Sequence, residues 1–544
     1  MKKNSFIQGA FIATFGIVFS KFLGIIYVIP FYSIVGAQGG ALYGYAYSIY
    51  TIFLGISQAG IPVAISKIIS EYDTLGYIKE KEKVFILGKK LMIILGIGSF
   101  ILMYLFSNVL ADIIIGNISG GNSINDVAFV IKVISTALLI VPILSIYRGY
   151  LQGHKYITAT SVSQVIEQMV RIFIIIIGSY LSLKVFKLGL TNTIGIAVFA
   201  ATIASLTSYI YILVKIKKNK KSFINKKENK MVIESSDKEI IKKILMCAIP
   251  FVMIDIFRSL INSVDVFMLV KVLVNQLNYS IATAEEVMSV ISTWGQKLNM
   301  IVVAVCSGLI ISLVPNLTTS IINNDHDDIE LKINQTISMA LFITIPMTFG
   351  ISLLAKPIWT LFYGYNELCT SVYKYYVFVA LSNIIFTIGV VTLQILKENK
   401  RVLIYLIIGL LLNVILNIPL LLLFNKIGLP EYYGSTTATI IGYTTSGILS
   451  LSYIKKKFNI KYKESYIKIF KIIIYTLFMI SGLYLLKIFI PFESTNRIIN
   501  LIYIISYSLI GFGIYILLSF KTKLIYQTFG SDFIKDIKKK KLHL

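Results

Sequence analysis

The sequence is poor in the residues on which soluble enzymes and disulfide-bonded extracellular domains depend. Its 544 residues include 3 cysteines, 3 histidines and 2 tryptophans, and only 14% of them are charged, against about 25% in a typical soluble protein. The cysteines Cys247, Cys306 and Cys369 are far apart in the chain, so they predict neither a disulfide framework nor a metal site. The shortage of charge excludes an ordinary soluble domain.

Acidic residues are scarce relative to basic ones: 26 Asp and Glu against 52 Lys and Arg, a formal net charge of +26. A strongly basic chain can bind nucleic acid, but the basic runs at 214–230 and 454–463 carry no pattern of aromatic residues for stacking on bases. Lys and Arg also accumulate in the cytoplasmic connections of membrane proteins. We therefore expect no nucleic-acid partner.

Long apolar runs are what the sequence has in abundance. The chain is 56% hydrophobic, with a mean hydropathy of +0.80, and its runs are long enough to cross a hydrocarbon layer of roughly 30 Å as helices. They predict an all-α polytopic membrane protein of about fourteen transmembrane helices. The predicted spans are 6–32, 41–66, 84–108, 127–149, 159–181, 191–214, 243–270, 287–318, 333–355, 372–396, 402–424, 434–454, 467–489 and 498–520. With the N-terminus inside, most Lys and Arg fall in cytoplasmic connections, so both termini are expected in the cytoplasm.

The spans fall into two similar blocks. "FSKFLGIIYVIPFY" in the first span has a counterpart in "FRSLINSVDVFM" of the seventh, and the connection "LQGHKYITA" resembles "LQILKENKRVLIY". Both blocks would start on the same side, which predicts a pseudo-two-fold axis along the membrane normal, as in two-lobed transporters. The predicted divisions are a lobe at 1–214, a basic cytoplasmic linker at 215–242, a second lobe at 243–454, two further helices at 455–520 and a basic cytoplasmic tail at 521–544.

Several charges lie deep inside predicted spans. Glu167 and Arg171 would lie roughly 13 and 20 Å from the membrane surface, and Lys21 and Arg258 roughly 21 to 23 Å. A charge at such depth costs about 2.5–3.5 kcal/mol unless it faces protein or water, so these residues are candidates for binding an anion. The spacing also permits a structural alternative, because Glu167 with Arg171, and Asp255 with Arg258, could neutralise each other on one helix.

Two stretches carry a family resemblance: "FSKFLGIIYVIPFYSIVGAQGGALYGYAYSIYTIFLGISQAGIPVAISKIISEY" (19–72) and "YRGYLQGHKYITATSVSQVIEQMVRI" (147–172). They resemble the SpoVB/MurJ-like lipid-linked oligosaccharide flippases of the multidrug/oligosaccharidyl-lipid/polysaccharide (MOP) exporter superfamily. The resemblance implies two six-helix lobes around a central cavity and alternating access. It also implies a groove beside the last two helices for a polyprenyl tail.

The function implied by the resemblance is translocation of a polyprenyl-diphosphate saccharide, such as the peptidoglycan precursor lipid II or a related cell-envelope or spore-cortex precursor. The family position adds Lys297 to the cations expected to meet the diphosphate, and Lys21 with Arg258 would form the clamp. The alternatives are a Wzx-type polysaccharide-unit flippase and a MATE-type multidrug exporter. A membrane glycosyltransferase is disfavoured, because the predicted outer loops are short and the histidines lie in cytoplasmic segments.

The same resemblance sets further expectations. We expect a transporter rather than an enzyme, in the bacterial cytoplasmic membrane, acting as a monomer or with cell-envelope synthesis enzymes. We expect no cofactor or metal. Transport would be driven by the membrane potential or by H⁺ or Na⁺ exchange at a carboxylate, for which the candidates are Glu167, Asp255 and Asp265.

Four residues are candidate hinges. Pro30, Pro62 and Pro315 fall within predicted spans, where a missing backbone hydrogen bond favours a bend. Gly24 and Pro30 flank the segment after Lys21, so bending of the first helix could couple cargo release to gate opening. Bends without a function are the alternative at every one of these positions.

Overall fold

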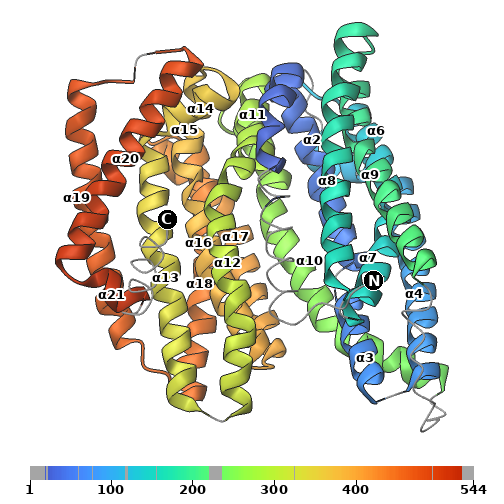
Figure 1. Ribbon diagram of the computed structural model, residues 1–544. Helices are drawn as coiled ribbons and strands as arrows, with labels where there is room; N and C mark the ends of the chain where they lie inside the picture. The colour runs from blue at the N-terminus through green and yellow to red at the C-terminus, as the bar shows by residue number, and fades with distance from the viewer. Residues whose placement is uncertain are drawn as a thin grey trace. The chain divides into compact units, whose positions relative to one another are not determined.

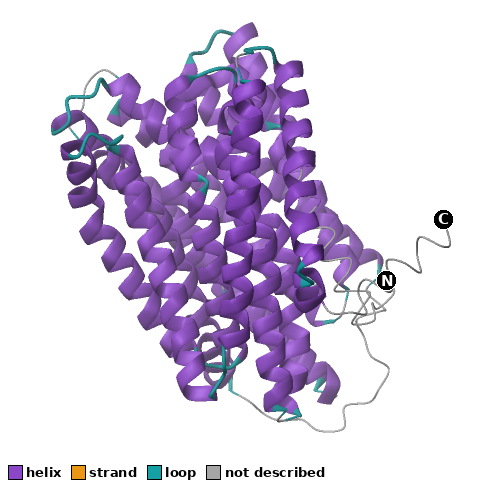
Figure 2. Ribbon diagram, turned by 90° about the vertical axis from the view of Figure 1, so that its left-hand side faces the viewer, coloured by secondary structure: helices purple, strands orange, loops and turns teal. Residues whose placement is uncertain are grey.

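A computed structural model describes residues 19 and 23–529, apart from 59, 76, 117–120, 155, 220–235, 324 and 493. Over these residues the chain is helical and contains no β-strand (Figure 2). It forms two compact units, Met1–Lys297 (unit 1) and Leu298–Leu544 (unit 2). The all-α expectation is confirmed.

Unit 1 is a bundle in which α8 and α9 run side by side, and α2 packs against α6, α10 and α11 (Figure 1). Its α-helices are α2 (Val28–Gln58), α3 (Ile61–Leu75), α4 (Ile78–Leu105), α5 (Ser107–Ile115), α6 (Ile124–Ser135), α7 (Val141–Gly153), α8 (Ile157–Tyr180), α9 (Leu190–Lys218), α10 (Asp237–Asn275) and α11 (Ile281–Ser289). Short segments of other helical types are the 3₁₀ helix η1 (Thr136–Leu139) and the π-helices η2 (Leu181–Val185) and η4 (Val290–Trp294).

Unit 2 contains most of α12 (Gly295–Ile322), which begins in unit 1. Its other helices are α13 (His326–Leu353), α14 (Ala355–Tyr363), α15 (Glu367–Tyr376), α16 (Phe378–Ile395), α17 (Asn399–Lys426), α18 (Tyr432–Phe458), α19 (Lys463–Phe489), α20 (Arg497–Lys521) and α21 (Leu524–Phe529). Within this unit α17 and α16 pack on α18, and α13 packs on α19. The boundary between the two compact units lies inside α12, and α10 and α11 of unit 1 pack on α2. The two symmetric lobes remain a prediction.

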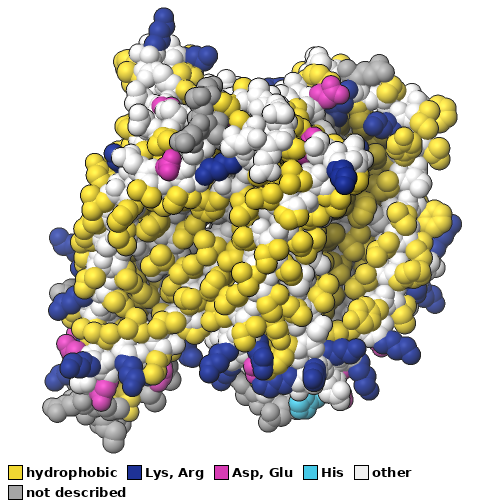
Figure 3. Space-filling model, turned by 180° about the vertical axis from the view of Figure 1, so that it is seen from behind, with side chains coloured by type: hydrophobic (Ala, Val, Ile, Leu, Met, Phe, Trp, Pro, Cys, Tyr) yellow, Lys and Arg dark blue, Asp and Glu magenta, His cyan; other side chains and the backbone are white. Residues whose placement is uncertain are grey.

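The helices agree with most of the predicted spans. Among the described residues, 11 helical segments are long and apolar enough to cross a membrane, so the predicted number of spans is not confirmed. Most of the first predicted span, 6–32, lies outside the described residues. The span 434–454 corresponds to α18, which is not one of the eleven. On the face in Figure 3, hydrophobic side chains cover the middle and Lys and Arg gather toward its upper and lower margins.

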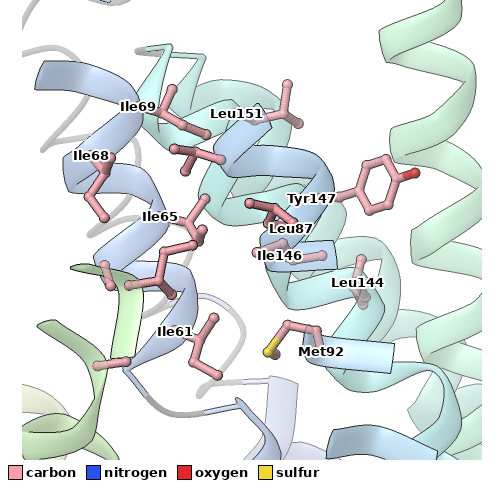
Figure 4. Close-up of a cluster of buried hydrophobic side chains, with 14 of the residues drawn as sticks. Ile61, Ile65, Ile68, Ile69, Leu87, Met92, Leu144, Ile146, Tyr147 and Leu151 are labelled. Atoms are coloured by element: carbon pink, nitrogen blue, oxygen red, sulfur yellow. The ribbon is translucent and has the colours of Figure 1, made fainter. Parts of the chain in front are cut away.

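The best-defined apolar core of unit 1 joins α3, α4 and α7. Figure 4 shows Ile61 of α3 facing Met92 of α4, and Ile69 of α3 facing Leu151 of α7; all four side chains are at most 2% exposed. Inside a bilayer, lipid tails are as apolar as these side chains, so close packing rather than removal from water favours this contact. The same reasoning applies to α17 and α18 in unit 2.

The candidate hinge Pro62 is the second residue of α3, so it begins a helix. A proline in the first turn replaces no intrahelical hydrogen bond. The break in the predicted span 41–66 comes earlier, at Gly60, whose φ is +71° and whose hydrogen atoms face the Ala248 carbonyl of α10. Pro30 lies in α2, and Gly24 is buried just before it. Pro315 lies in α12. Their role as hinges stays a prediction.

Candidate functional site

Three helices of unit 1 share a buried ion network. Arg148 of α7 directs one guanidinium nitrogen, Nη2, to Glu167 of α8 at 2.9 Å, and the same nitrogen lies 3.0 Å from Ser208 Oγ of α9. Its Nε donates to Ser163 Oγ of α8 at 2.9 Å. The side chain of Arg148 is only 12% exposed. Arg148 therefore connects α7, α8 and α9 through hydrogen bonds on two sides of its guanidinium.

Glu167 is shared between two arginines. Its second oxygen accepts from Arg171 Nη2 at 2.5 Å, one helical turn further along α8. The side chains of Glu167 and Arg171 are 14% and 23% exposed. The predicted pair on one helix face is therefore confirmed, and it is part of a larger group. With two cations and one carboxylate, the network keeps a net positive charge.

Arg171 faces tyrosines of α2. The hydroxyls of Tyr43, Tyr47 and Tyr50 lie within electrostatic range of its guanidinium. The rings of Tyr43 and Tyr47 stack at 4.8 Å, and Tyr50 meets Tyr47 edge to face at 5.5 Å. Arg171 Nε is buried and has no hydrogen-bond partner. Arg171 thus keeps one buried donor that no described group satisfies.

Lys297 lies near the same aromatic helix. Its Nζ is 5.6 Å from the centre of the Tyr27 ring, a distance at which a cation is attracted to the face of an aromatic ring. Tyr27 also neighbours Phe31 at 6.2 Å, and Phe31 contacts Trp294 at 5.6 Å. Lys297 therefore contacts the residue that directly precedes α2.

The remaining predicted residues are placed less closely together. Asp255 of α10 is exposed and lies within electrostatic range of Arg258, whereas Asp265, further along α10, is 3% exposed. Lys21 lies outside the described residues, so its clamp with Arg258 stays a prediction. The sequence analysis did not single out Arg148, although it is part of the quoted stretch 147–172. Arg148 precedes Glu167 by 19 residues in two consecutive helices, and this spacing could have indicated that the two side chains meet.

Unit 2 contains an apolar cavity of about 450 Å³. Helices α12, α13, α14, α15, α19 and α20 contribute to its wall, which carries no charged side chain. Three of its residues are Met347 of α13, Leu483 of α19 and Phe512 of α20. Pockets of this size hold small ligands, and a mostly apolar lining, with Ser508 and three tyrosines as its polar members, suits a hydrocarbon chain.

The described part of the chain contains no group of three or more His, Cys, Asp or Glu that could hold a metal ion. The ion network and the apolar cavity instead offer contacts for an anionic headgroup and for a hydrocarbon. Together with the membrane-spanning helices, they define the class: a polytopic membrane transporter.

Comparison with known proteins narrows this class. The family model described as "Polysaccharide biosynthesis protein" matches residues 6–306. The lipid II flippase MurJ of Bacillus subtilis (strain 168) is 33% identical over 466 residues, which is 85% of this chain and 84% of MurJ. Stage V sporulation protein B of the same organism is 24% identical over 226 residues, or 42% of each chain. The chain belongs to the polysaccharide biosynthesis protein family.

Solved structures show the same fold. A lipid II flippase MurJ in an inward closed conformation has a TM-score of 0.65 and 18% identity, covering 94% of this chain and 98% of that chain. An inward-facing MATE family transporter of the MOP superfamily has a TM-score of 0.64 and 15% identity, covering 81% of this chain and 94% of that chain. The predicted MOP fold and the SpoVB/MurJ resemblance are confirmed. The named activities among these relatives are transport, as expected for a chain that is not an enzyme.

Proposed function

We propose that the protein flips a polyprenyl-diphosphate-linked saccharide, lipid II or a related cell-envelope precursor, from the inner to the outer leaflet of the bacterial cytoplasmic membrane. The observation that carries this proposal is the apolar cavity of unit 2. Its lining includes α19 and α20, the two helices beyond the twelve of the predicted lobes. A long isoprenoid chain needs such a lining, whereas a compact drug does not.

The ion network of unit 1 is a separate feature whose chemistry suits an anionic group. Arg148 and Arg171 carry two positive charges against the single carboxylate of Glu167. Charge-assisted hydrogen bonds from guanidinium groups are well suited to phosphate oxygens. The unpartnered Nε of Arg171 makes it the residue that we expect to contact a diphosphate.

The two alternatives from the same superfamily differ in their cargo. A MATE-type exporter would carry drugs, many of them cationic, and a net positive network repels such molecules. A Wzx-type flippase would carry another polyprenyl-diphosphate sugar. The latter would use the same cavity and the same cations, and it differs only in the saccharide.

The driving force is proposed to be the membrane potential or a cation exchanged at a carboxylate. Both oxygens of Glu167 already accept hydrogen bonds from guanidinium groups, so a cation there would have to compete with two arginines. Asp255 and Asp265 are therefore the stronger candidates. Asp255→Asn and Asp265→Asn variants should change the ion dependence of transport if exchange occurs, whereas unchanged dependence in both would leave the potential as the driving force.

The proposed orientation places both termini in the cytoplasm, and the protein would act alone or beside cell-envelope synthesis enzymes. Cysteines introduced at Lys218 and Lys455 should resist an impermeant thiol reagent applied to intact cells. Labelling at either position would contradict this orientation.

The function is tested by reconstituting the full chain into liposomes. Fluorescent polyprenyl-diphosphate sugars should move between leaflets at a rate that depends on the protein, and a cationic dye should not. Dye transport without lipid movement would favour the MATE-type alternative. A comparison of lipid II with lipids that carry other saccharides distinguishes the MurJ-like function from the Wzx-type function.

A further inference from the structure

Three lysines of unit 2 lie near one another at predicted outer helix ends. Lys356 is the second residue of α14, Lys374 lies in the last turn of α15, and Lys487 lies in the last turn of α19. The charges of Lys374 and Lys356 act on the Lys487 ammonium group. None of the three lysines forms an ion pair with a carboxylate of the described residues. Lysines are otherwise disfavoured on the outer side of a membrane protein.

Local contacts hold two of these side chains, and the helix that carries the third, in place. Lys356 Nζ lies 5.2 Å from the centre of the Tyr365 ring, and Lys487 Nζ lies 5.3 Å from that of Phe492. The backbone carbonyl of Lys374 accepts a hydrogen bond from Ser352 Oγ at 2.8 Å, which ties α15 to the end of α13. Ring contacts of this kind position an ammonium group without neutralising it.

The lysines adjoin the apolar cavity. Leu354 and Ile358 flank Lys356 in the chain, Tyr373 precedes Lys374, and Leu483 lies one helical turn before Lys487. All four of these neighbours line the cavity. The three cations, which we name the basic cluster, therefore belong to helix segments that form part of the cavity wall.

We propose that the basic cluster binds the diphosphate of a polyprenyl-diphosphate lipid whose chain occupies the apolar cavity. It would be a release subsite, used when the headgroup has reached the outer side. The inference rests on the proposed function and adds a second anion site to it, distinct from the arginines of unit 1.

The charge of the cluster favours a diphosphate over an ordinary phospholipid. Like charges held close together repel one another, and a polyanion that bridges them relieves this repulsion. A diphosphate offers more than one negative charge and several acceptor oxygens, whereas phosphatidylglycerol offers one phosphate. Because the cluster is partly exposed, binding should weaken as salt is added.

The test uses the full chain in phosphatidylcholine nanodiscs and a benzophenone-bearing farnesyl diphosphate as the probe. After illumination, peptides that contain Met347 and Met479, which line the cavity, should carry the probe. The triple variant Lys356→Gln/Lys374→Gln/Lys487→Gln should lower this labelling roughly tenfold, because charge-assisted contacts to the diphosphate are lost. The triple arginine variant should restore it.

Controls separate the cluster from general charge effects. Lys426→Gln removes an exposed lysine from the last turn of α17, away from the cavity lining, and should leave labelling unchanged. A benzophenone-bearing farnesol should label wild type and the triple variant equally. If the triple variant does not fold, the exposed Lys374→Gln single variant is used, with a several-fold loss expected.

Three results would overturn the proposal. Full diphosphate labelling of the variants would show that the lysines do not bind the headgroup, and an equal loss of farnesol labelling would show that they only shape the cavity. Competition by phosphatidylglycerol as strong as by unlabelled farnesyl diphosphate would identify a phospholipid site. Transport in liposomes tests the proposed function separately. If the protein flips the lipid but the lysine variants are labelled as strongly as wild type, the subsite alone is refuted. If labelling depends on the basic cluster but the protein does not flip the lipid, the function alone is refuted.

Discussion

Unit 1 and unit 2 manage charge in opposite ways. Unit 1 holds Arg148, Glu167 and Arg171 inside its helix bundle, each at most 23% exposed. Unit 2 keeps the lining of its cavity free of charge, and its ion pairs lie toward helix ends, as between Lys457 and Glu398. A charge within the bilayer must be compensated by a neighbour. Substitutions in the ion network of unit 1 should therefore disturb charge pairing, whereas substitutions in the cavity wall of unit 2 should change only the space that the cavity offers. The variants below test this difference.

The largest expected effect is that of Glu167→Gln. It removes the carboxylate shared by Arg148 and Arg171 and leaves two buried cations without compensation. Loss of one partner from a buried pair costs about 3–5 kcal/mol, so we expect the free energy of unfolding to fall by about 3 kcal/mol in detergent denaturation. The matched control Glu71→Gln breaks a more exposed pair with Lys243 and should cost less than about 1 kcal/mol. Equal stability of the two variants would contradict the conclusion that Glu167 compensates two buried arginines.

The next effect separates the two arginines. Arg148→Gln removes hydrogen bonds to Ser163, Glu167 and Ser208, so it should lower stability by about 2 kcal/mol. Arg171→Gln should lower stability less but reduce cargo binding roughly tenfold, since its available donor is lost. Binding of a polyprenyl diphosphate and thermal unfolding, measured on both variants, give the comparison. If the two variants lose stability and ligand binding to a similar extent, then both arginines stabilise the fold and neither has a separate role in binding.

Filling the cavity of unit 2 should impair transport without affecting folding. Gly350 lines the cavity, and a side chain placed there meets open space. Gly350→Phe should therefore lower lipid transport several-fold, with stability kept within about 1 kcal/mol because glycine is a weak helix former. Gly513→Phe in α20 also enters open space but is not part of the lining. Equal transport by the two variants would show that the cavity holds no lipid chain.

The smallest expected effect concerns an ion pair at the helix ends of unit 2. A hydrogen bond from Lys457 holds the pKa of the Glu398 carboxyl below its ordinary value of 4.5, with help from the Tyr453 hydroxyl. A carboxylate whose pKa is lowered by folding adds stability above its ordinary pKa and loses it as the pH falls further. Because the Lys457 side chain is exposed, screening by solvent keeps this contribution small. Unfolding of wild type and Glu398→Gln, compared at pH 7 and in mild acid, should differ only at the higher pH.

Half of the ion network could be predicted from the sequence. Glu167 and Arg171 are one turn apart on a single predicted helix, so helical geometry alone brings them together. Arg148 is on another helix, and its distance to Glu167 depends on how α7 packs against α8. The apolar cavity could not be predicted from any local sequence pattern either, because its lining consists of residue types that are common throughout the chain.

The sequence by itself determined that this protein is helical, lies in a membrane and carries charge where lipid would not tolerate it. These properties follow from apolar run length and the cost of unpaired backbone groups in a bilayer, which act locally along the chain. Only the tertiary structure decided that Arg148 joins Glu167, that Gly60 breaks the second span against α10 and that α19 and α20 help to line a cavity. Each of these depends on side chains from different helices meeting in space, which residue spacing along one helix does not specify.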